Sequence, residues 1–160
     1  MIPAAPRREL LHATAVAHAG RAVLILGPSG AGKSSLAIRM LALGAHLVSD
    51  DLTEVEAGAE GLIACCPRPD LRGVIESRGI GLLRVPYSDR VPVALAVDLA
   101  QEETARLPPL RSITLLGMPV PLVLRPQNDH LSESILLILA GGRHDGGGCD
   151  RAGNGPVAGT

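Results

Sequence analysis

Apolar residues occur along this chain mainly in short runs, most of them bounded by Gly, Pro, Asp or Ser. Two early runs, at residues 14–19 and 22–26, are joined at Gly20 and Arg21 and predict two short strands. The second run, AVLIL, contains no polar residue, which is typical of a strand covered on both faces. Residues 33–43 are mostly good helix formers, and Gly44 follows them where it can cap the helix C-terminus.

Further along the chain, the pattern predicts more strands than helices. We expect strands at residues 46–49, 52–55, 62–64, 71–75, 81–85, 91–99, 112–117 and 119–124. A last helix is expected over residues 130–139, with Asn128 or Asp129 as its N-cap. Because the helices fall at two places, the pattern lacks a regular alternation of strand and helix, and it favours an α/β fold with a mixed β-sheet.

The domain organisation follows from length and local composition. The 160 residues suffice for one domain with a sizeable core, which we place at residues 1–140. Residues 141–160 are rich in glycine and nearly devoid of large apolar side chains. Such a segment cannot repay the entropy lost on ordering, so we expect a disordered tail.

Composition argues against several classes of partner. The formal net charge is −1, no basic stripe is present, and Tyr87 is the one aromatic residue, so neither nucleic acid nor an anionic membrane is expected as a partner. The three cysteines, Cys65, Cys66 and Cys149, do not have metal-ligand spacing. Their odd number, with no signal peptide and no long apolar run, predicts a cytoplasmic protein.

The segment GPSGAGKS fits the phosphate-loop pattern G-x-x-x-x-G-K-[ST] and lies between a predicted strand and a predicted helix. Glycines let successive backbone N–H groups point at phosphate oxygens, and the helix N-terminus adds partial positive charge. Lys33, the single lysine of the chain, would bridge the β- and γ-phosphates, and the Ser34 hydroxyl would bind Mg²⁺. The predicted nucleotide-binding residues are Gly27, Pro28, Ser29, Gly30, Ala31, Gly32, Lys33 and Ser34.

A phosphoryl-transfer site usually has a further carboxylate at a strand end, and two positions qualify. Asp98 follows an apolar run, although its strand also looks like an ordinary core strand. Asp50 and Asp51 follow the strand after the predicted helix, which places them at the same sheet edge as Lys33. Two adjacent carboxylates repel, which favours proton transfer by one of them, whereas the alternative is a simple turn.

Several motifs together resemble the catalytic domain of the bacterial HPr kinase/phosphorylase family. His12 stands fifteen positions before Gly27, HLVSDD is similar to the family's R-L-V-A-D-D element, and ESRGIGLLRV is similar to its signature. The segments ETARLPP and MPVPLVLRPQN resemble later family elements. The resemblance implies an α/β fold with a mixed β-sheet, a P-loop kinase domain of the HPr kinase / PEP carboxykinase type, in a short form without the N-terminal domain of long members.

The resemblance also implies an activity. Members phosphorylate a serine of HPr, a small phosphocarrier protein of phosphotransferase systems, with ATP or pyrophosphate and Mg²⁺, and many reverse the reaction by phosphorolysis with inorganic phosphate. Long members form hexamers, so a homo-oligomer is possible here. Carried over to this sequence, Asp50 would be the general base. The other implied catalytic residues are Lys33, His12, Arg78 and Arg106, and the implied Mg²⁺ ligands are Ser34 and Glu76.

Two other functions stay open at this point. One is an ATP-binding regulatory module that signals through contact with another protein. The other is a kinase of the same fold that phosphorylates a small molecule. A phosphate loop is compatible with all three, since it predicts nucleotide binding but no particular reaction.

Overall fold

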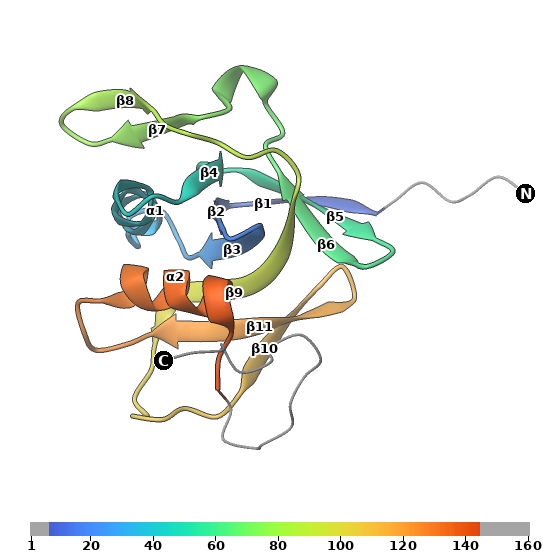
Figure 1. Ribbon diagram of the computed structural model, residues 1–160, viewed down its shortest axis with the longest axis vertical. Helices are drawn as coiled ribbons and strands as arrows, with labels where there is room; N and C mark the ends of the chain where they lie inside the picture. Colours follow the sequence, from blue (N-terminus) through green and yellow to red (C-terminus); the bar gives the residue numbers. More distant parts are fainter. Residues whose placement is uncertain (1–6, 145–160) are drawn as a thin grey trace, which may run out of the picture.

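The computed structural model describes residues 7–144, and it contains a curved mixed sheet, a separate hairpin and two α-helices (Figure 1). In chain order the elements are β1 (Arg8–Leu11), β2 (Ala13–His18), β3 (Arg21–Leu26), α1 (Lys33–Ala42), β4 (His46–Ser49), β5 (Thr53–Gly58), β6 (Gly61–Cys65), the 3₁₀ turn η1 (Pro69–Leu71), β7 (Val74–Ser77), β8 (Gly81–Arg84), β9 (Val91–Glu102), β10 (Arg111–Leu115), β11 (Met118–Arg125) and α2 (Leu131–Gly141).

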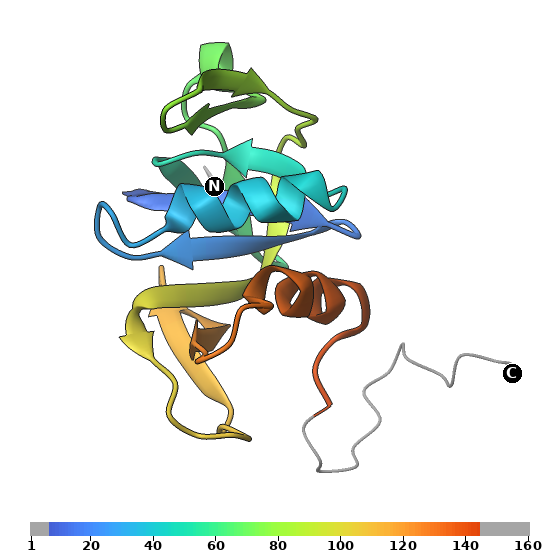
Figure 2. The same cartoon turned by 90° about the vertical axis from the view of Figure 1, so that its left-hand side faces the viewer.

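The large sheet runs in the order β1-β5-β6-β9-β3-β2-β4, and β11 joins it at β9 and pairs with β10. The strands β3 and β11 lie parallel to β9, whereas the other pairs of this sheet are antiparallel. The expected mixed sheet is therefore confirmed. The β7–β8 hairpin stands beside α1 and β4, apart from the large sheet (Figure 2).

The core lies on both faces of the sheet. On one face, Val23 and Ile25 of β3 pack in a cluster with side chains of α1 and α2. On the other face, Ala22 and Leu24 pack with residues of β5, β6 and β11. All four side chains are fully buried. This alternation explains the uninterrupted apolar run of β3, because each successive side chain of a strand points to the opposite face.

Helix α1 ends as its sequence predicts. Gly44 has a φ of +103°, and its N–H donates to Leu41 O at 3.0 Å, while Ala45 N–H donates to Met40 O at 3.1 Å. These two bonds form a Schellman motif, in which glycine tolerates the left-handed conformation that ends the helix. The expected C-terminal cap is therefore confirmed.

The predicted cap of α2 is wrong. The N-cap is His130, without a side-chain cap bond, and Asn128 instead accepts the His130 N–H through Oδ1 at 3.1 Å. The helix is held by burial rather than by a cap, because Ile135 and Leu139 are buried against the core next to α1. Packing of an apolar face supplies most helical stability in proteins, so a polar cap is dispensable here.

Apart from small shifts of strand ends, two strands differ from the predicted pattern. Residues 71–75 are not one strand, because Pro69 opens the turn η1 and Gly73 has a φ of +69°, so β7 begins at Val74. Strand β1 was not predicted, since its sequence RELL is largely exposed at the sheet edge.

Of the expected glycine-rich tail, residues 145–160 lie outside the described residues. Within residues 7–144, neither helix is long and apolar enough to cross a membrane.

Candidate active site

One edge of the sheet collects the ends of several strands. Leu26 of β3 pairs with Asp98 of β9, and Asp98 pairs with Leu124 of β11, so the carboxyl ends of β3 and β11 lie in one row with Asp98 of the longer parallel strand β9. Strand β2 is antiparallel and starts at this row, because Ala13 pairs with Leu26. Polar groups at the carboxyl edge of such a sheet commonly form the ligand site.

The phosphate loop begins directly after β3 and leads into α1, as predicted. Gly30 and Gly32 have φ values of +85° and +99°, a backbone conformation that residues with a side chain rarely adopt. At Gly27, with a φ of +147°, an added Cβ would lie 3.0 Å from the Ala31 Cβ. The three glycines therefore permit a tight loop whose backbone can approach a ligand closely.

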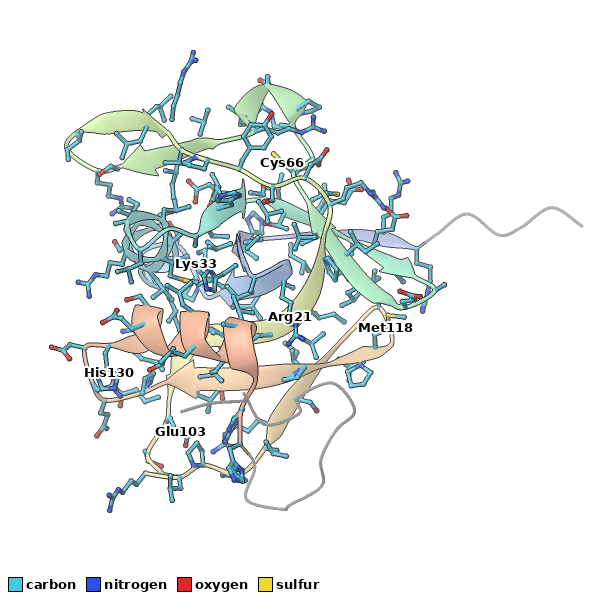
Figure 3. All side chains as sticks on the ribbon, viewed as in Figure 1. Arg21, Lys33, Cys66, Glu103, Met118 and His130 are labelled. Carbon is cyan, nitrogen blue, oxygen red and sulfur yellow. The ribbon has the colours of Figure 1, made fainter. Side chains whose placement is uncertain are left out.

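Lys33 is the first residue of α1 and is buried, with 8 % of its surface exposed (Figure 3). Its Nζ donates to Gly27 O at 2.7 Å and to Pro28 O at 3.1 Å. Burial of an ammonium group is costly unless it is hydrogen-bonded, and these two carbonyls supply the bonds. The only lysine of the chain thus lies folded across the loop that would hold phosphate.

Asp50 lies directly after β4, and two hydroxyls donate to its Oδ1. Ser34 Oγ is 2.8 Å away, and Thr14 Oγ1 is 3.0 Å away. The Thr14 hydroxyl also accepts the Asp51 N–H at 3.2 Å, and Asp51 has a φ of +65°. Within residues 7–144, Asp50 Oδ2 takes part in no hydrogen bond. The Asp50–Asp51 turn is therefore tied to both β2 and α1 through side chains.

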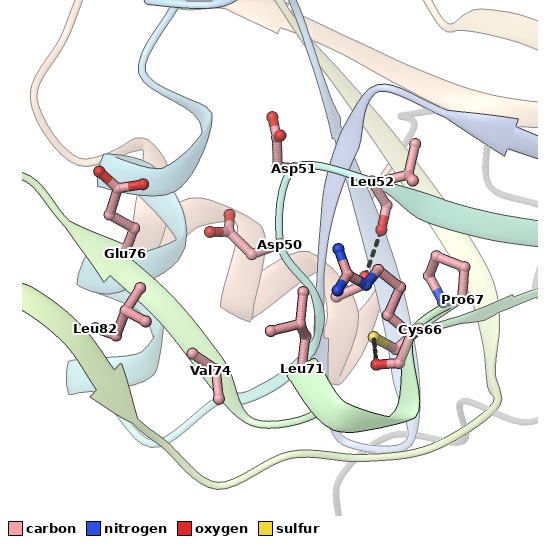
Figure 4. Close-up of a pocket in the computed structure, with 11 residues that line it drawn as sticks. Asp50, Asp51, Leu52, Cys66, Pro67, Leu71, Val74, Glu76 and Leu82 are labelled. Atoms are coloured by element: carbon pink, nitrogen blue, oxygen red, sulfur yellow. Dashed lines mark hydrogen bonds between the residues drawn. The ribbon is translucent and has the colours of Figure 1, made fainter.

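A cavity of about 290 Å³ opens beside this turn (Figure 4). Asp50, Asp51 and Glu76 line it with carboxylates, and Glu76 reaches it from β7. The remaining lining residues are Ser49, Leu52, Cys66, Pro67, Arg68, Leu71, Val74 and Leu82. The cavity therefore combines an acidic end next to the phosphate loop with a largely apolar wall.

The other predicted catalytic residues form no hydrogen bond or ion pair with Lys33, Ser34 or Asp50 in the described residues. His12 is exposed and immediately precedes Ala13, which pairs with the last residue of β3. Arg78 is exposed in the turn of the β7–β8 hairpin, and Arg106 is exposed in the loop after β9. Within residues 7–144, none of the three side chains forms a hydrogen bond or an ion pair. The structure brings Lys33 and Ser34 together with Asp50, and it shows no contact from His12, Arg78 or Arg106 to them.

The loop that carries Arg106 is held by an ion pair. Arg111 donates to both carboxylate oxygens of Glu103, each at 3.0 Å, and the Thr104 and Ala105 N–H groups donate to Oε2. These hydrogen bonds, that of Arg111 foremost, lower the pKa of the Glu103 carboxyl from its ordinary value. Asp98, the other carboxylate considered, accepts from Ala100 N–H and from the Gln101 amide, both at 2.8 Å.

Two polar residues at this edge were missed by the sequence prediction. Thr14 contacts Asp50, and Arg125 donates through Nη2 to Ala31 O of the phosphate loop at 2.5 Å. Thr14 lies inside an apolar strand run, where threonine is an ordinary strand former. Arg125 is 94 residues from its partner. The parallel pairing of β3, β9 and β11 would have been needed to find it.

The oxygen atoms at this edge are of the type that binds Mg²⁺, which prefers oxygen ligands and usually retains water and phosphate ligands. Ser34 gives its hydroxyl proton to Asp50, so lone pairs of Oγ remain for a cation, and Glu76 presents its carboxylate to the adjoining cavity. Among residues 7–144, no group of three or more His, Cys, Asp or Glu is arranged to hold a metal. Ser34 and Glu76 thus offer oxygen ligands of the type that Mg²⁺ accepts, and nucleotide phosphates would have to complete the coordination of a cation here.

Comparison with known proteins assigns the family. The model of the HPr serine kinase C-terminal domain matches residues 4–89, which include the phosphate loop, Asp50 and Glu76. The chain belongs to this family. The HPr kinase/phosphorylase of Bordetella petrii is 42 % identical over 115 residues, which are 63 % of this chain and 37 % of that protein. That of Cupriavidus necator is 33 % identical over 128 residues, 72 % of this chain and 39 % of that protein.

The fold agrees with this HPr kinase family. The structure of the Hpr(Ser) kinase/phosphatase from Coxiella burnetii superposes with a TM-score of 0.67 and 26 % sequence identity, covering 82 % of this chain and 87 % of that one. The expected α/β fold of the HPr kinase type is thus confirmed. The alignments span less than two fifths of the length of these two curated relatives.

Proposed function

We propose that this domain is a Mg-ATP-dependent serine kinase that phosphorylates an HPr-like phosphocarrier protein of a phosphotransferase system. The observation that carries the proposal is the bond of 2.8 Å between Ser34 of the phosphate loop and Asp50. It places a carboxylate next to the residues that would hold the nucleotide phosphates. Family membership supplies the class of substrate, because the relatives are named HPr kinase/phosphorylase.

In the forward reaction, some of these residues neutralise the charge of the phosphates, and another accepts a proton. The backbone N–H groups of the loop and Lys33 bind the β- and γ-phosphates and neutralise charge that develops on them. Asp50, through the oxygen Oδ2 that has no partner in residues 7–144, takes the proton of the acceptor serine. The serine oxygen bonds to the γ-phosphorus, the bond from that phosphorus to the β-phosphate oxygen breaks, and ADP leaves.

Mg²⁺, when bound by Ser34 and Glu76 with the phosphates, supplies further neutralisation of charge. In the reverse reaction, inorganic phosphate attacks phosphoserine, pyrophosphate forms, and Asp50 returns the proton to the leaving serine oxygen. His12, Arg78 and Arg106 stay proposed members of the charged site. Their exposed side chains would be accessible to a large acceptor protein.

The test is phosphate transfer from ATP to a purified HPr-like carrier of the same genome. Asp50→Asn should reduce transfer by about 100-fold or more while ADP binding is retained, because a general base acts on the acceptor proton and not on the nucleotide. Glu60→Gln, a carboxylate change in the exposed β5–β6 turn, is the matched control.

Two results would overturn the proposal. One is a wild-type protein that binds ATP but transfers no phosphate to the carrier under any metal condition, which would favour a regulatory module. The other is phosphate on a small metabolite in place of the carrier, which would favour a small-molecule kinase.

A further inference from the structure

Arg125 reaches the phosphate loop from the far side of the sequence. It is the last residue of β11, its guanidinium is half-buried, and Nη2 donates to Ala31 O. The same nitrogen lies 4.0 Å from the position that a Cβ on Gly32 would occupy. The contact is therefore made at the peptide that joins Ala31 to Gly32.

This peptide has one carbonyl and one N–H group, and they point in opposite directions because the peptide is planar and trans. Fixing the Ala31 carbonyl on the side of Arg125 therefore directs the Gly32 N–H to the other side. Gly32 has a φ of +99°, and glycine is the residue least able to hold a peptide orientation by itself. Within residues 7–144, Ala31 O accepts no other hydrogen bond, and the Gly32 N–H donates none.

The backbone of Arg125 is itself held in place. Its carbonyl accepts the Glu103 N–H at 2.7 Å, and the preceding Leu124 pairs with Asp98 of β9. Glu103 is in turn bound through its side chain to Arg111. The guanidinium thus projects from a braced strand end, and the same contacts brace the loop that carries Arg106.

We infer that Arg125 is a positioning residue for polyphosphate binding, which holds the Ala31 carbonyl away from the phosphates and keeps the Gly32 N–H directed toward them. A reversed peptide would present a carbonyl oxygen, with partial negative charge, to an anionic ligand. The ligands concerned are small molecules that contain a diphosphate unit, namely ATP, ADP or pyrophosphate. The inference rests on the proposed function for the existence of this nucleotide site.

The experiment measures binding of Mg-ADP and Mg-pyrophosphate to the full chain by calorimetry. Arg125→Ala should weaken both by about 10- to 100-fold, the range expected when a charge-assisted hydrogen bond is lost. Added guanidinium, at millimolar concentrations that do not unfold the protein, should restore part of the affinity, whereas methylammonium should not. Arg21→Ala removes the same side chain from the exposed first residue of β3 and should leave both affinities unchanged.

Kinetics give a second readout. Loss of Gly32 positioning weakens ground-state and transition-state phosphate binding alike, so KM for ATP should rise more than kcat falls. If Arg125→Ala does not fold, Arg125→Gln retains most of the stem and carries the same comparison.

The inference is wrong if the variant binds both ligands within about twofold of wild type, or if kcat falls at unchanged KM. A wild-type protein that binds neither ligand would instead refute the nucleotide site itself, so the two failures are distinguishable.

Discussion

Thr14 is a single side chain that changes the interpretation of the site. It is fully buried, it donates to Asp50, and it accepts from the Asp51 N–H. Replacing it with valine keeps the shape but removes the hydroxyl, which leaves a backbone N–H without its acceptor. We expect Thr14→Val to lower the free energy of unfolding by about 1–3 kcal/mol and to lower kcat by roughly tenfold.

The nucleotide affinity of Thr14→Val should remain near that of wild type, because Thr14 does not contact the loop that would hold phosphate. Urea denaturation, ADP calorimetry and carrier phosphorylation measure the three quantities. Thr14→Ser restores the hydroxyl and should recover most of kcat, and failure of serine to do so would contradict a role for the hydrogen bonds.

Lys33 stands alone in a chain whose other 14 basic Lys or Arg residues are arginines. Its compact ammonium fits between two carbonyls at 2.7 and 3.1 Å, a space that suits a point charge better than a planar guanidinium. Lys33→Arg should lose transfer by about 100-fold or more, with the fold retained. Circular dichroism and the carrier assay check this, and near-normal transfer would show that charge alone is sufficient.

At the scale of elements, the features that depend on local sequence were predicted correctly. The loop from Gly27 to Ser34, the glycine after α1 and the strand before Asp50 each depend on neighbours in the chain, and all were predicted. By contrast, Thr14 and Arg125 acquire their roles through pairing partners 36 and 94 residues away. Hydrophobic periodicity contains no information on which strands pair, so these contacts required the structure.

The β7–β8 hairpin, which carries Glu76 and Arg78, depends on close packing at Gly73. This glycine has a φ of +69°, and an added Cβ would lie 2.8 Å from Tyr87 Cδ1 and 2.9 Å from Val85 O. Gly73→Ala should therefore destabilise the protein by about 1–3 kcal/mol and displace the hairpin. Gly20→Ala is the matched control. Gly20 has a similar φ of +76°, but apart from its chain neighbours no atom would lie within 4 Å of an added Cβ.

Thermal unfolding of both glycine variants separates strain from crowding. Backbone strain is shared, so the excess loss of Tm in Gly73→Ala measures the contact with Tyr87 and Val85. Equal losses in the two variants would mean that crowding at Gly73 contributes nothing.

The β9–β10 connection provides a pH-dependent contribution to stability. The hydrogen bonds from Arg111 lower the pKa of Glu103 in the folded protein from an ordinary value of 4.5. A carboxylate whose pKa is lower in the folded than in the unfolded protein stabilises the folded state fully at pH values above its unfolded pKa. This contribution is lost as the pH falls through the folded pKa. The Tm difference between wild type and Glu103→Gln should therefore be largest near neutral pH and shrink below about pH 4.5.

A Tm series in buffers from pH 7 to pH 3 measures this difference. Glu60→Gln, at an exposed turn, should show no comparable pH-dependent difference from wild type. A wild-type advantage for Glu103 that persists unchanged at low pH would contradict the role of the ionised carboxylate.

At the scale of the whole molecule, the site is a meeting point of segments distant in the sequence. Thr14, Ser34 and Arg125 come from β2, α1 and β11, and Asp50 directly follows β4. Their hydrogen bonds join β2 and α1 to the end of β4, and β11 to the phosphate loop. A ligand that binds at such a point binds the folded state alone, because unfolding separates all four. Binding should therefore stabilise the entire domain rather than a single loop.

Mg-ADP at about 100 times its Kd should add about 2.7 kcal/mol to the free energy of unfolding, which corresponds to a rise in Tm of roughly 5–15 °C. Differential scanning calorimetry over a series of ADP concentrations measures the rise, which should follow the logarithm of free ligand concentration. Lys33→Ala should abolish most of the shift, because the cation that binds the phosphates is gone. A ligand-induced shift that is equal in Lys33→Ala would place the nucleotide away from the loop of residues 27–34.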